Sequence, residues 1–202
     1  MYKDNELTIR PIEEKDLFNI WEFVYKEEAP EWKKWDAPYY LHTSKTYEEF
    51  MKKSDSWVNQ KDYWAVEING FFIGVVTYYW EHEPSKWLEA GIILYESNNW
   101  GKGIGTRSLK LWINHLFNTL PLVRVGFTTW SGNKRMIRVG EKLGMKMEAN
   151  LKIQAVNSWS SINTWVFWAC MYMIDCIQIL VVKSVSYNIF TINFHIHNLT
   201  LT

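Results

Sequence analysis

Seven residues with three glycines form the segment best suited to bind a phosphate group. They are Trp100-Gly101-Lys102-Gly103-Ile104-Gly105-Thr106, between a predicted strand and a predicted helix. Glycines let the backbone approach a ligand closely, and the free N–H groups at a helix N-terminus attract anions. The segment therefore predicts a site for a phosphate or a pyrophosphate.

The spacing of these glycines selects among known phosphate loops. A Walker P-loop needs Lys-Ser or Lys-Thr after its last glycine, and a dinucleotide-binding fingerprint needs a sixth-position glycine, where Thr106 stands. Gly103 and Gly105 fit instead a coenzyme A pyrophosphate loop, Q/R-x-x-G-x-G/A, although Trp100 replaces its Gln or Arg. A glycine-rich turn without a ligand is the alternative.

The elements that must position this loop follow from periodicity and turn signals. Asn69-Gly70 between two β-rich runs predicts a hairpin with a type I′ turn. Asn133 and Gly144 suit the start and end of a helix. The predicted strands are 6–12, 62–68, 71–80, 87–95, 122–130 and 145–155, and the predicted helices are 14–27, 46–59, 104–118 and 133–143. This order predicts an α+β or mixed α/β sheet rather than a bundle or barrel.

Composition changes abruptly near residue 150. All 10 glycines and all 5 prolines lie between Pro11 and Gly144, and after residue 150 the formal charges are Lys152, Asp175 and Lys183. We expect residues 1–150 to form a domain and residues 151–202 an atypical hydrophobic tail. The net charge of +0 argues against a nucleic-acid binder. An N-terminus without an apolar run favours a cytoplasmic location.

Residues 6–150 resemble the GCN5-related N-acetyltransferase (GNAT) superfamily, in particular its ribosomal-protein alanine N-acetyltransferase branch. The resemblance rests on four stretches in the family's order: LTIRPIEEKDL, INGFFIGVVTYY, LEAGIILYESNNWGKGIGTRSL and TTWSGNKRMIRVGEKLGM. It implies the GNAT fold, a mixed central sheet with helices on both faces. It also implies an enzyme that transfers the acetyl group of acetyl-CoA to a primary amine by direct attack on the thioester.

The resemblance also implies a set of residues that bind acetyl-CoA. Two neighbouring strands of this fold separate, and the pantetheine arm lies between them. Backbone groups of Ile92 and Leu94 would pair with the arm, and Asn133 would face it, with a pure helix cap as the alternative for Asn133. The pyrophosphate would contact the loop, namely Trp100, Gly101, Lys102, Gly103, Ile104, Gly105 and Thr106. No metal is expected.

The catalytic groups implied by the family are only partly present. Glu89 stands where relatives often carry an acidic residue, and could act as a base through water, or be a solvated strand-edge carboxylate. The N–H of Leu94 could hold the oxyanion. Many relatives carry a tyrosine seven residues after the Asn that Asn133 matches, and this chain has Gly140 there. Tyr95 or water would then protonate the leaving thiolate, or the thiolate would leave unassisted. A catalytically impaired CoA-binding protein is therefore the alternative function.

The acceptor is an amine on a small molecule or a protein N-terminus, and its identity stays open. Residues 27–40 hold carboxylates and aromatic rings that suit a cationic amine, although we favour a surface loop with packed aromatics. We expect His42, His82 and His115 to be structural or exposed. Nucleic acid and membrane are not expected as partners, and a homodimer is left open.

Three interpretations compete for the tail. Residues 165–182 are just long enough for a transmembrane helix, but contain Asp175 and Gln178. A family-specific extension is the second. We favour the third, an altered reading frame near the end of the gene. If the codon of Thr164 ends in A, the reading phase that starts at that A encodes Met-Gly-x-Leu across residues 164–168, which is the ending that the family pattern leads us to expect. We also expect residues 163–173 to be able to form a strand.

Overall fold

The computed structural model describes residues 1–38, 40–154 and 161–170, and for 150–154 and 161–170 it describes the backbone alone. The chain divides into two compact units, Met1–Ala169 and Cys170–Thr202. The description below concerns the first unit.

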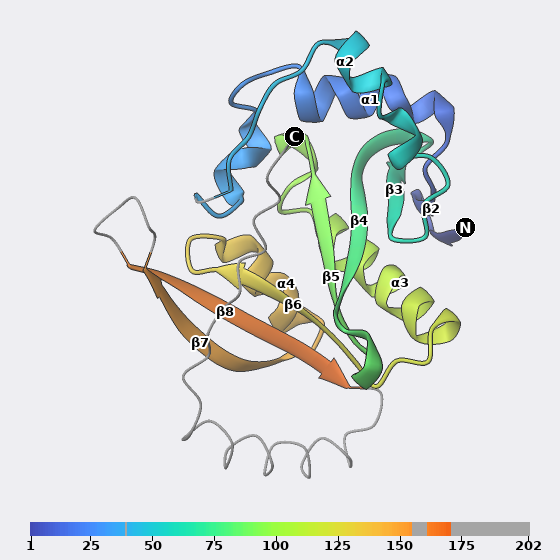
Figure 1. Cartoon of the computed structure of the whole chain (residues 1–202). Helices are drawn as coiled ribbons and strands as arrows, with labels where there is room; N and C mark the ends of the chain where they lie inside the picture. The colour runs from blue at the N-terminus through green and yellow to red at the C-terminus, as the bar shows by residue number, and fades with distance from the viewer. Residues whose placement is uncertain (39, 155–160, 171–202) are drawn as a thin grey trace. The chain divides into compact units, whose positions relative to one another are not determined.

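An eight-stranded sheet forms the centre of this unit (Figure 1), in the order β1-β2-β3-β4-β5-β6-β8-β7. Strands β1 to β5 are joined in antiparallel pairs, β7 pairs with β8 in the same way, and β5 and β6 run parallel. The strands are β1 (Tyr2–Asp4), β2 (Leu7–Pro11), β3 (Tyr63–Ile68), β4 (Phe71–His82), β5 (Trp87–Leu94), β6 (Arg124–Trp130), β7 (Lys146–Gln154) and β8 (Ser161–Cys170).

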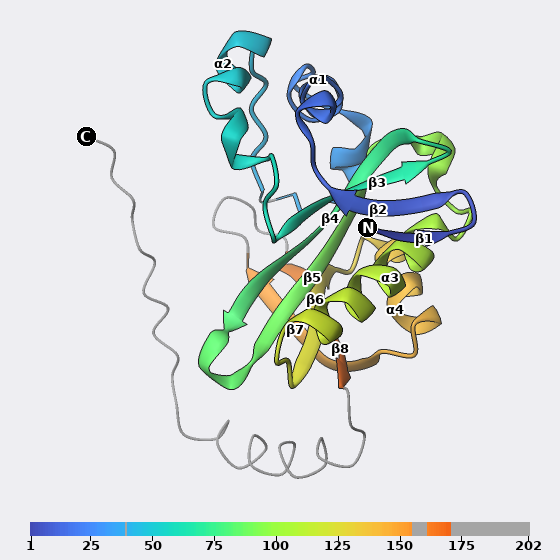
Figure 2. The same ribbon diagram turned by 90° about the vertical axis from the view of Figure 1, so that its right-hand side faces the viewer.

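Helices cover the two faces of the sheet (Figure 2), so the predicted mixed fold is confirmed. On one face lie η1 (Glu14–Asp16), α1 (Leu17–Ile20), η2 (Trp21–Tyr25) and α2 (Tyr47–Met51), and on the other lie α3 (Ile104–Thr119) and α4 (Lys134–Lys142). Each face has its own hydrophobic core, one around Trp112 and Leu109 of α3, the other around Ile20 and Phe50.

Local turn and cap signals correctly predict several boundaries. Asn69 and Gly70 have φ angles of 52° and 82°, which is the left-handed pair that a type I′ hairpin requires. The side chain of Asn133 accepts a hydrogen bond from the N–H of Met136 at 3.0 Å and so caps α4. Gly144 ends the same helix with a φ of 70°.

Other boundaries differ from the prediction. The helix expected over 14–27 is instead a run of 3-10, α and π turns from Glu14 to Tyr25. The helix expected over 46–59 is shorter: α2 ends at Met51, and a 3-10 turn, η4 (Ser54–Ser56), follows. Strand β1 was not expected, because its three residues carry too short a pattern to recognise.

The described part of the tail is β-structure. Strand β7 confirms the strand expected over 145–155, and β8 occupies most of the segment expected to be able to form a strand. Residues 165–170 are thus in a strand and not in a transmembrane helix, whereas residues 171–182 lie outside the described residues. Among the described residues, no helix has the length and apolar character that crossing a membrane requires. The domain boundary at residue 150 and the altered reading frame stay predictions.

Candidate functional site

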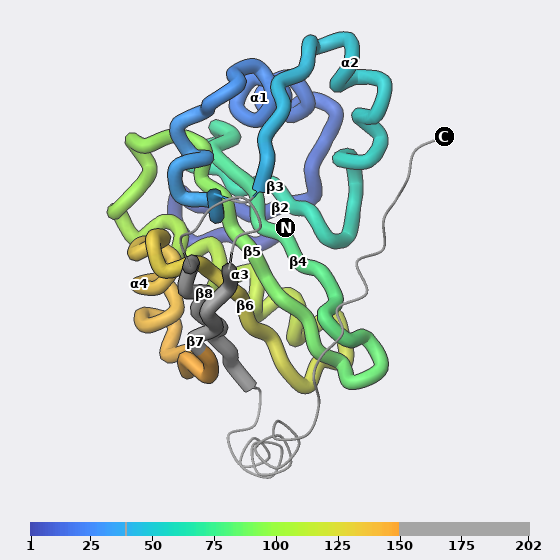
Figure 3. The backbone as a smooth tube through the Cα atoms, turned by 60° about the vertical axis from the view of Figure 1, so that its left-hand side comes forward, coloured from blue at the N-terminus to red at the C-terminus, as the bar shows by residue number. Residues whose placement is uncertain are grey.

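The parallel strands β5 and β6 separate after a short paired stretch. Trp87, Leu88 and Glu89 of β5 pair with Arg124, Val125 and Gly126 of β6. Beyond these pairs β5 continues beside β4 (Figure 3), whereas β6 leads into α4. The end of β5 therefore has one edge that β6 does not cover.

A cavity of about 570 Å³ opens at this separation. Its walls come from four places: the end of β5, the glycine loop with the start of α3, the helix α4, and the 3-10 helix η3 (Glu31–Trp35) with Asp36. Four segments that are distant in the sequence thus meet around one space, which has the size of a small-molecule site.

The predicted cofactor residues largely meet at this cavity. The lining includes Ile92, Leu94, Trp100, Gly101, Gly103, Gly105, Thr106 and Asn133. Lys102 and Ile104 do not line it: Lys102 is exposed, and Ile104 is buried in the core under α3. Within the loop, alternate side chains point away from the cavity, so these two residues could act there through their backbone alone.

The glycine loop has the backbone that close approach requires. Gly101 and Gly103 have φ angles of 76° and 81°, a region in which side chains are strained. Gly103 is the N-cap of α3, and a Cβ on Gly105 would lie 3.9 Å from Leu94 and 4.0 Å from Val139, two residues of the cavity wall. The missing side chain of Gly105 therefore leaves part of the cavity open beside the first amides of α3.

Asn133 uses its side chain within the protein. Its Oδ1 accepts from Met136, and its Nδ2 donates to the carbonyl oxygen of Trp35 at 2.9 Å. The Nε1 of Trp130 donates to the same carbonyl oxygen at 2.9 Å. Asn133 is thus a helix cap that also ties η3 to α4, and it lines the cavity at the same time.

Glu89 lies where the two strands begin to separate, and it is not a solvated edge residue. It is 5% exposed. Its carboxylate accepts hydrogen bonds from the N–H of Thr128 at 3.1 Å, from Thr128 Oγ1 at 2.6 Å, and from the hydroxyl of Tyr79. These donors fix the carboxylate across the gap between β5 and β6.

Two neighbours of Glu89 have raised pKa values. Burial and the hydrogen bond to Glu89 raise the pKa of the Tyr79 hydroxyl, which therefore stays protonated and donates. Burial and the charge of Glu89 raise the pKa of Glu81 above its ordinary value. Both shifts have burial as their first cause and the neighbouring Glu89 as a further one.

Tyr95 is not brought to the cavity. It is 5% exposed and stacks with Phe23 and Phe72, at ring centroid distances of 5.8 and 6.0 Å. Because successive side chains of a strand alternate, Tyr95 projects to the opposite face from Leu94, into the core under α1. Burial raises the pKa of its hydroxyl. Neither Tyr95 nor the other predicted catalytic residue, Glu89, is among the residues that line the cavity.

The structure adds residues that sequence reasoning missed. Lys134, Arg135, Arg138 and Lys142 of α4 all line the cavity. Their spacing was the available signal, since residues 134, 138 and 142 recur every four positions and so share one helix face. Trp32, Trp35 and Asp36 belong to the segment 27–40, for which we favoured a surface loop over an acceptor site, and they line the same cavity.

His42, His82 and His115 have separate surroundings. His42 bonds the carbonyl of Glu27, His82 bonds Ser85, and His115 contacts Tyr2 and packs on Trp64. Among residues 1–38, 40–154 and 161–170, no group of three or more His, Cys, Asp or Glu is arranged to hold a metal ion.

Comparisons with known proteins agree with this fold. The family model of the acetyltransferase (GNAT) domain matches residues 6–146. No curated protein sequence matches the chain. Among solved structures, a spermidine N-acetyltransferase from Vibrio cholerae, in complex with CoA and spermine, is similar with a TM-score of 0.66 at 15% identity, over 83% of this chain and 96% of that one.

Two further CoA complexes share the fold. The ribosomal L7/L12 alpha-N-protein acetyltransferase RimL has a TM-score of 0.67 at 16% identity, over 83% of this chain and 95% of its own. The aminoglycoside acetyltransferase AAC(6′)-Ib has a TM-score of 0.61 at 18% identity, over 85% of this chain and 99% of its own. The family match spans more than half of the sequence, and the chain therefore belongs to the GNAT acetyltransferase family.

Proposed function

We propose that this protein is an N-acetyltransferase that transfers the acetyl group of acetyl-CoA to a primary amine. The observation that carries the proposal is the cavity at the separation of β5 and β6, walled by a glycine loop at a helix N-terminus and by the cationic helix α4. The similar proteins act on spermidine, on ribosomal L7/L12 and on aminoglycosides, which are three different amine acceptors.

The residues present fit acetyl-CoA. The amides of Gly103 to Thr106 at the start of α3 suit a diphosphate. The open edge of β5 at Ile92 and Leu94 offers backbone groups to the amides of a pantetheine arm. The space beside Gly105, which a Cβ would fill, suits a ligand that approaches the backbone closely.

When bound, acetyl-CoA supplies an activated thioester carbonyl. The chain itself must hold the oxyanion and remove a proton from the amine, because an alkylammonium with a pKa of ~10 is mostly charged at neutral pH. We assign the first role to the N–H of Leu94 and the second to Glu89, acting through water. Tyr79 and Thr128 keep the carboxylate oriented.

The alternative is a protein that binds CoA without turnover. The observation in its favour is Gly140, a buried glycine at the α4 position where many relatives carry a tyrosine. The cavity offers no replacement from Tyr95, which lies in the core. This alternative predicts CoA binding with no acetyl transfer to any amine.

The test is turnover of acetyl-CoA against a panel of amines: a polyamine, an aminoglycoside and a peptide with a free N-terminus. Glu89→Gln keeps the shape and one of the two acceptor oxygens but removes the base, so we expect kcat to fall about 100-fold with little change in the KM for acetyl-CoA. Glu48→Gln, an exposed change on α2, is the matched control. Equal rates for wild type and Glu89→Gln would remove the assigned base, and binding without turnover would favour the alternative.

The remaining expectations concern partners and location. A cytoplasmic location, the absence of nucleic-acid and membrane partners, and the amine class of the acceptor all stay predictions.

A further inference from the structure

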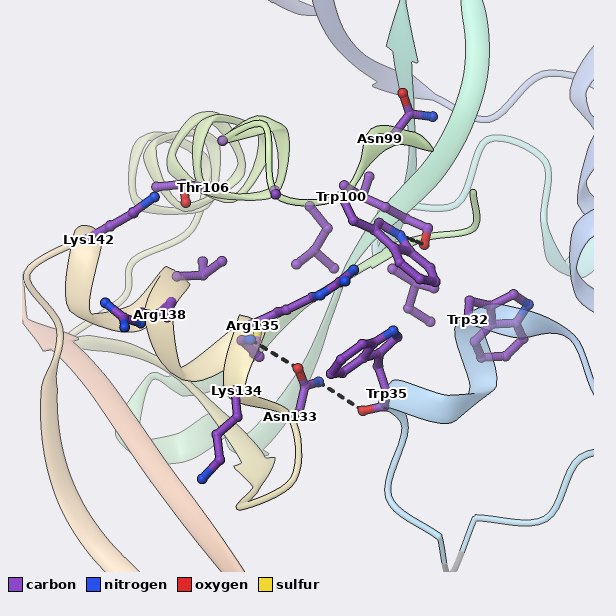
Figure 4. A pocket seen from close by; sticks show the side chains of 18 of the residues that line it. Trp32, Trp35, Asn99, Trp100, Thr106, Asn133, Lys134, Arg135, Arg138 and Lys142 are labelled. Carbon is purple, nitrogen blue, oxygen red and sulfur yellow. Dashed lines mark hydrogen bonds between the residues drawn. The ribbon is translucent and has the colours of Figure 1, made fainter. Parts of the chain in front are cut away.

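A cation stands in the middle of the cavity, between two tryptophans. Arg135 extends from α4 across the cavity to Trp100, with Trp35 beside it (Figure 4). Its Cζ lies 4.2 Å from the centroid of the Trp35 ring and 4.6 Å from that of Trp100. The two rings meet at 83°, so the guanidinium occupies the corner that they form. Cation–π contacts of this kind hold the group without using its N–H donors.

Arg135 has no anionic partner among the described residues, unlike Arg10, Arg107 and Arg124. Arg10 donates to Asp16 and Glu67, and Arg107 donates to Asp4 and Glu6. No carboxylate among the described residues pairs with Arg135. Its five N–H donors are therefore held in place and unused, in a fork that matches phosphate oxygens.

The charge of the cavity also favours an anionic ligand. Arg135 shares the lining with three further cations of α4, whereas the acidic residue of the lining is Asp36, which pairs with Lys33. The positive end of the α3 dipole adds to this field. Such a concentration of like charge is unfavourable until an anion enters.

The first position of the glycine loop does not supply a donor to that anion. Trp100 stands there, and its only side-chain donor, Nε1, binds the carbonyl oxygen of Leu94 at 2.8 Å. The guanidinium of Arg135 lies directly over its ring. The position at which the loop pattern carries Gln or Arg is thus covered by an arginine from another helix.

A second donor in the same wall also lacks a partner. The Nε1 of Trp35 is buried and has no hydrogen-bond partner among the described residues. An unpaired buried N–H is costly, about 1–3 kcal/mol. A ligand acceptor that bonded to this N–H would remove the cost.

We propose that Arg135 binds the diphosphate of coenzyme A, and that Trp35 and Trp100 form the clamp that holds its guanidinium ready for it. The proposal rests on the proposed function, because it requires the cavity to be the CoA site. It assigns to α4 the side-chain donor that the first position of the loop lacks, beside the loop amides.

The test is calorimetric titration of the full chain with CoA and with 3′-dephospho-CoA, repeated over a salt series. For Arg135→Ala we expect the Kd of both ligands to rise about 10- to 100-fold and the salt dependence of binding to become shallower. Arg135→Lys keeps the charge without the planar fork, so the affinity of this variant for CoA should lie between those of wild type and Arg135→Ala. Lys110→Ala, an exposed charge on α3 outside the cavity, is the matched control and should bind like wild type.

Each outcome is decisive. Failure of wild type to bind CoA would overturn the proposed function and this inference with it. Wild-type binding with an unchanged Arg135→Ala would overturn the inference alone. A loss confined to CoA would place Arg135 at the 3′-phosphate and overturn the diphosphate assignment. A loss with an unchanged salt dependence, or with a lowered Tm, would show a purely structural role.

Discussion

The two edges of β5 have different partners. Toward β4 the strand is paired from Trp87 to Leu94, whereas toward β6 the pairing stops after Glu89. Buried backbone groups need hydrogen-bond partners, so an edge left open beside a cavity requires water or a ligand. One strand therefore provides both scaffold and site: its closed edge fixes the position of the open one. The predictions below test this division.

The largest expected effect comes from Gly74 on the closed edge. A Cβ there would lie 2.2 Å from the carbonyl oxygen of Ile93, a backbone atom that cannot rotate away. We expect Gly74→Ala to cost about 3 kcal/mol of stability, and to weaken CoA binding because β5 must shift. Denaturant unfolding and calorimetry measure the two effects.

Gly91→Ala, on the same pair of strands, β4 and β5, is the control. Its Cβ would meet Thr77 Oγ1 at 2.6 Å, the end of a side chain that can rotate. We expect it to cost less than Gly74→Ala. If the two variants were equally stable, the close approach of β4 and β5 would not be the reason for glycine at position 74.

Gly103→Val tests the glycine loop, which lines the cavity beside the open edge of β5. Gly103 has a φ of 81°, so valine there should cost about 2 kcal/mol and raise the Kd for CoA about 10-fold. Gly70→Val at the β3–β4 hairpin, with a φ of 82°, carries similar strain away from the cavity. Gly70→Val should lose similar stability and keep its CoA affinity. Equal CoA affinities in the two variants would remove the loop from the site.

The smallest effect concerns Tyr79, which bridges the strands through Glu89. Its folded-state pKa lies above the ordinary value of 10.0. Its contribution to stability is therefore fully present below pH 10.0 and is lost as the pH rises through the folded-state pKa. We expect the stability of Tyr79→Phe to decline less steeply than that of wild type in this alkaline range. Parallel curves from unfolding at a series of pH values would contradict the raised pKa.

Local signals predicted much of the fold and the loop. The Asn69-Gly70 turn, the Asn133 cap and the glycines of the loop each act within a few residues, and the structure contains all of them. The family motifs assigned Leu94 and Thr106 to one site, and both residues line the cavity.

What the sequence could not predict depends on distant contacts. Glu89 is held by Thr128, 39 positions away in the sequence. Arg135 is held by Trp35, which belongs to a distant segment of the chain, η3. Tyr95 was misplaced for a related reason: which face of β5 its side chain joins depends on the packing of the helices on the two faces of the sheet.

The carbonyl oxygen of Trp35 has a consequence for how the protein folds. It accepts from Trp130 and Asn133, bonds that span 95 and 98 residues of chain. Contacts of such sequence separation repay their loop-closure entropy only after most of the intervening chain is ordered. We therefore expect this wall of the cavity to be completed late in folding and to be the first to open, so that amide exchange in η3 would exceed that of β4.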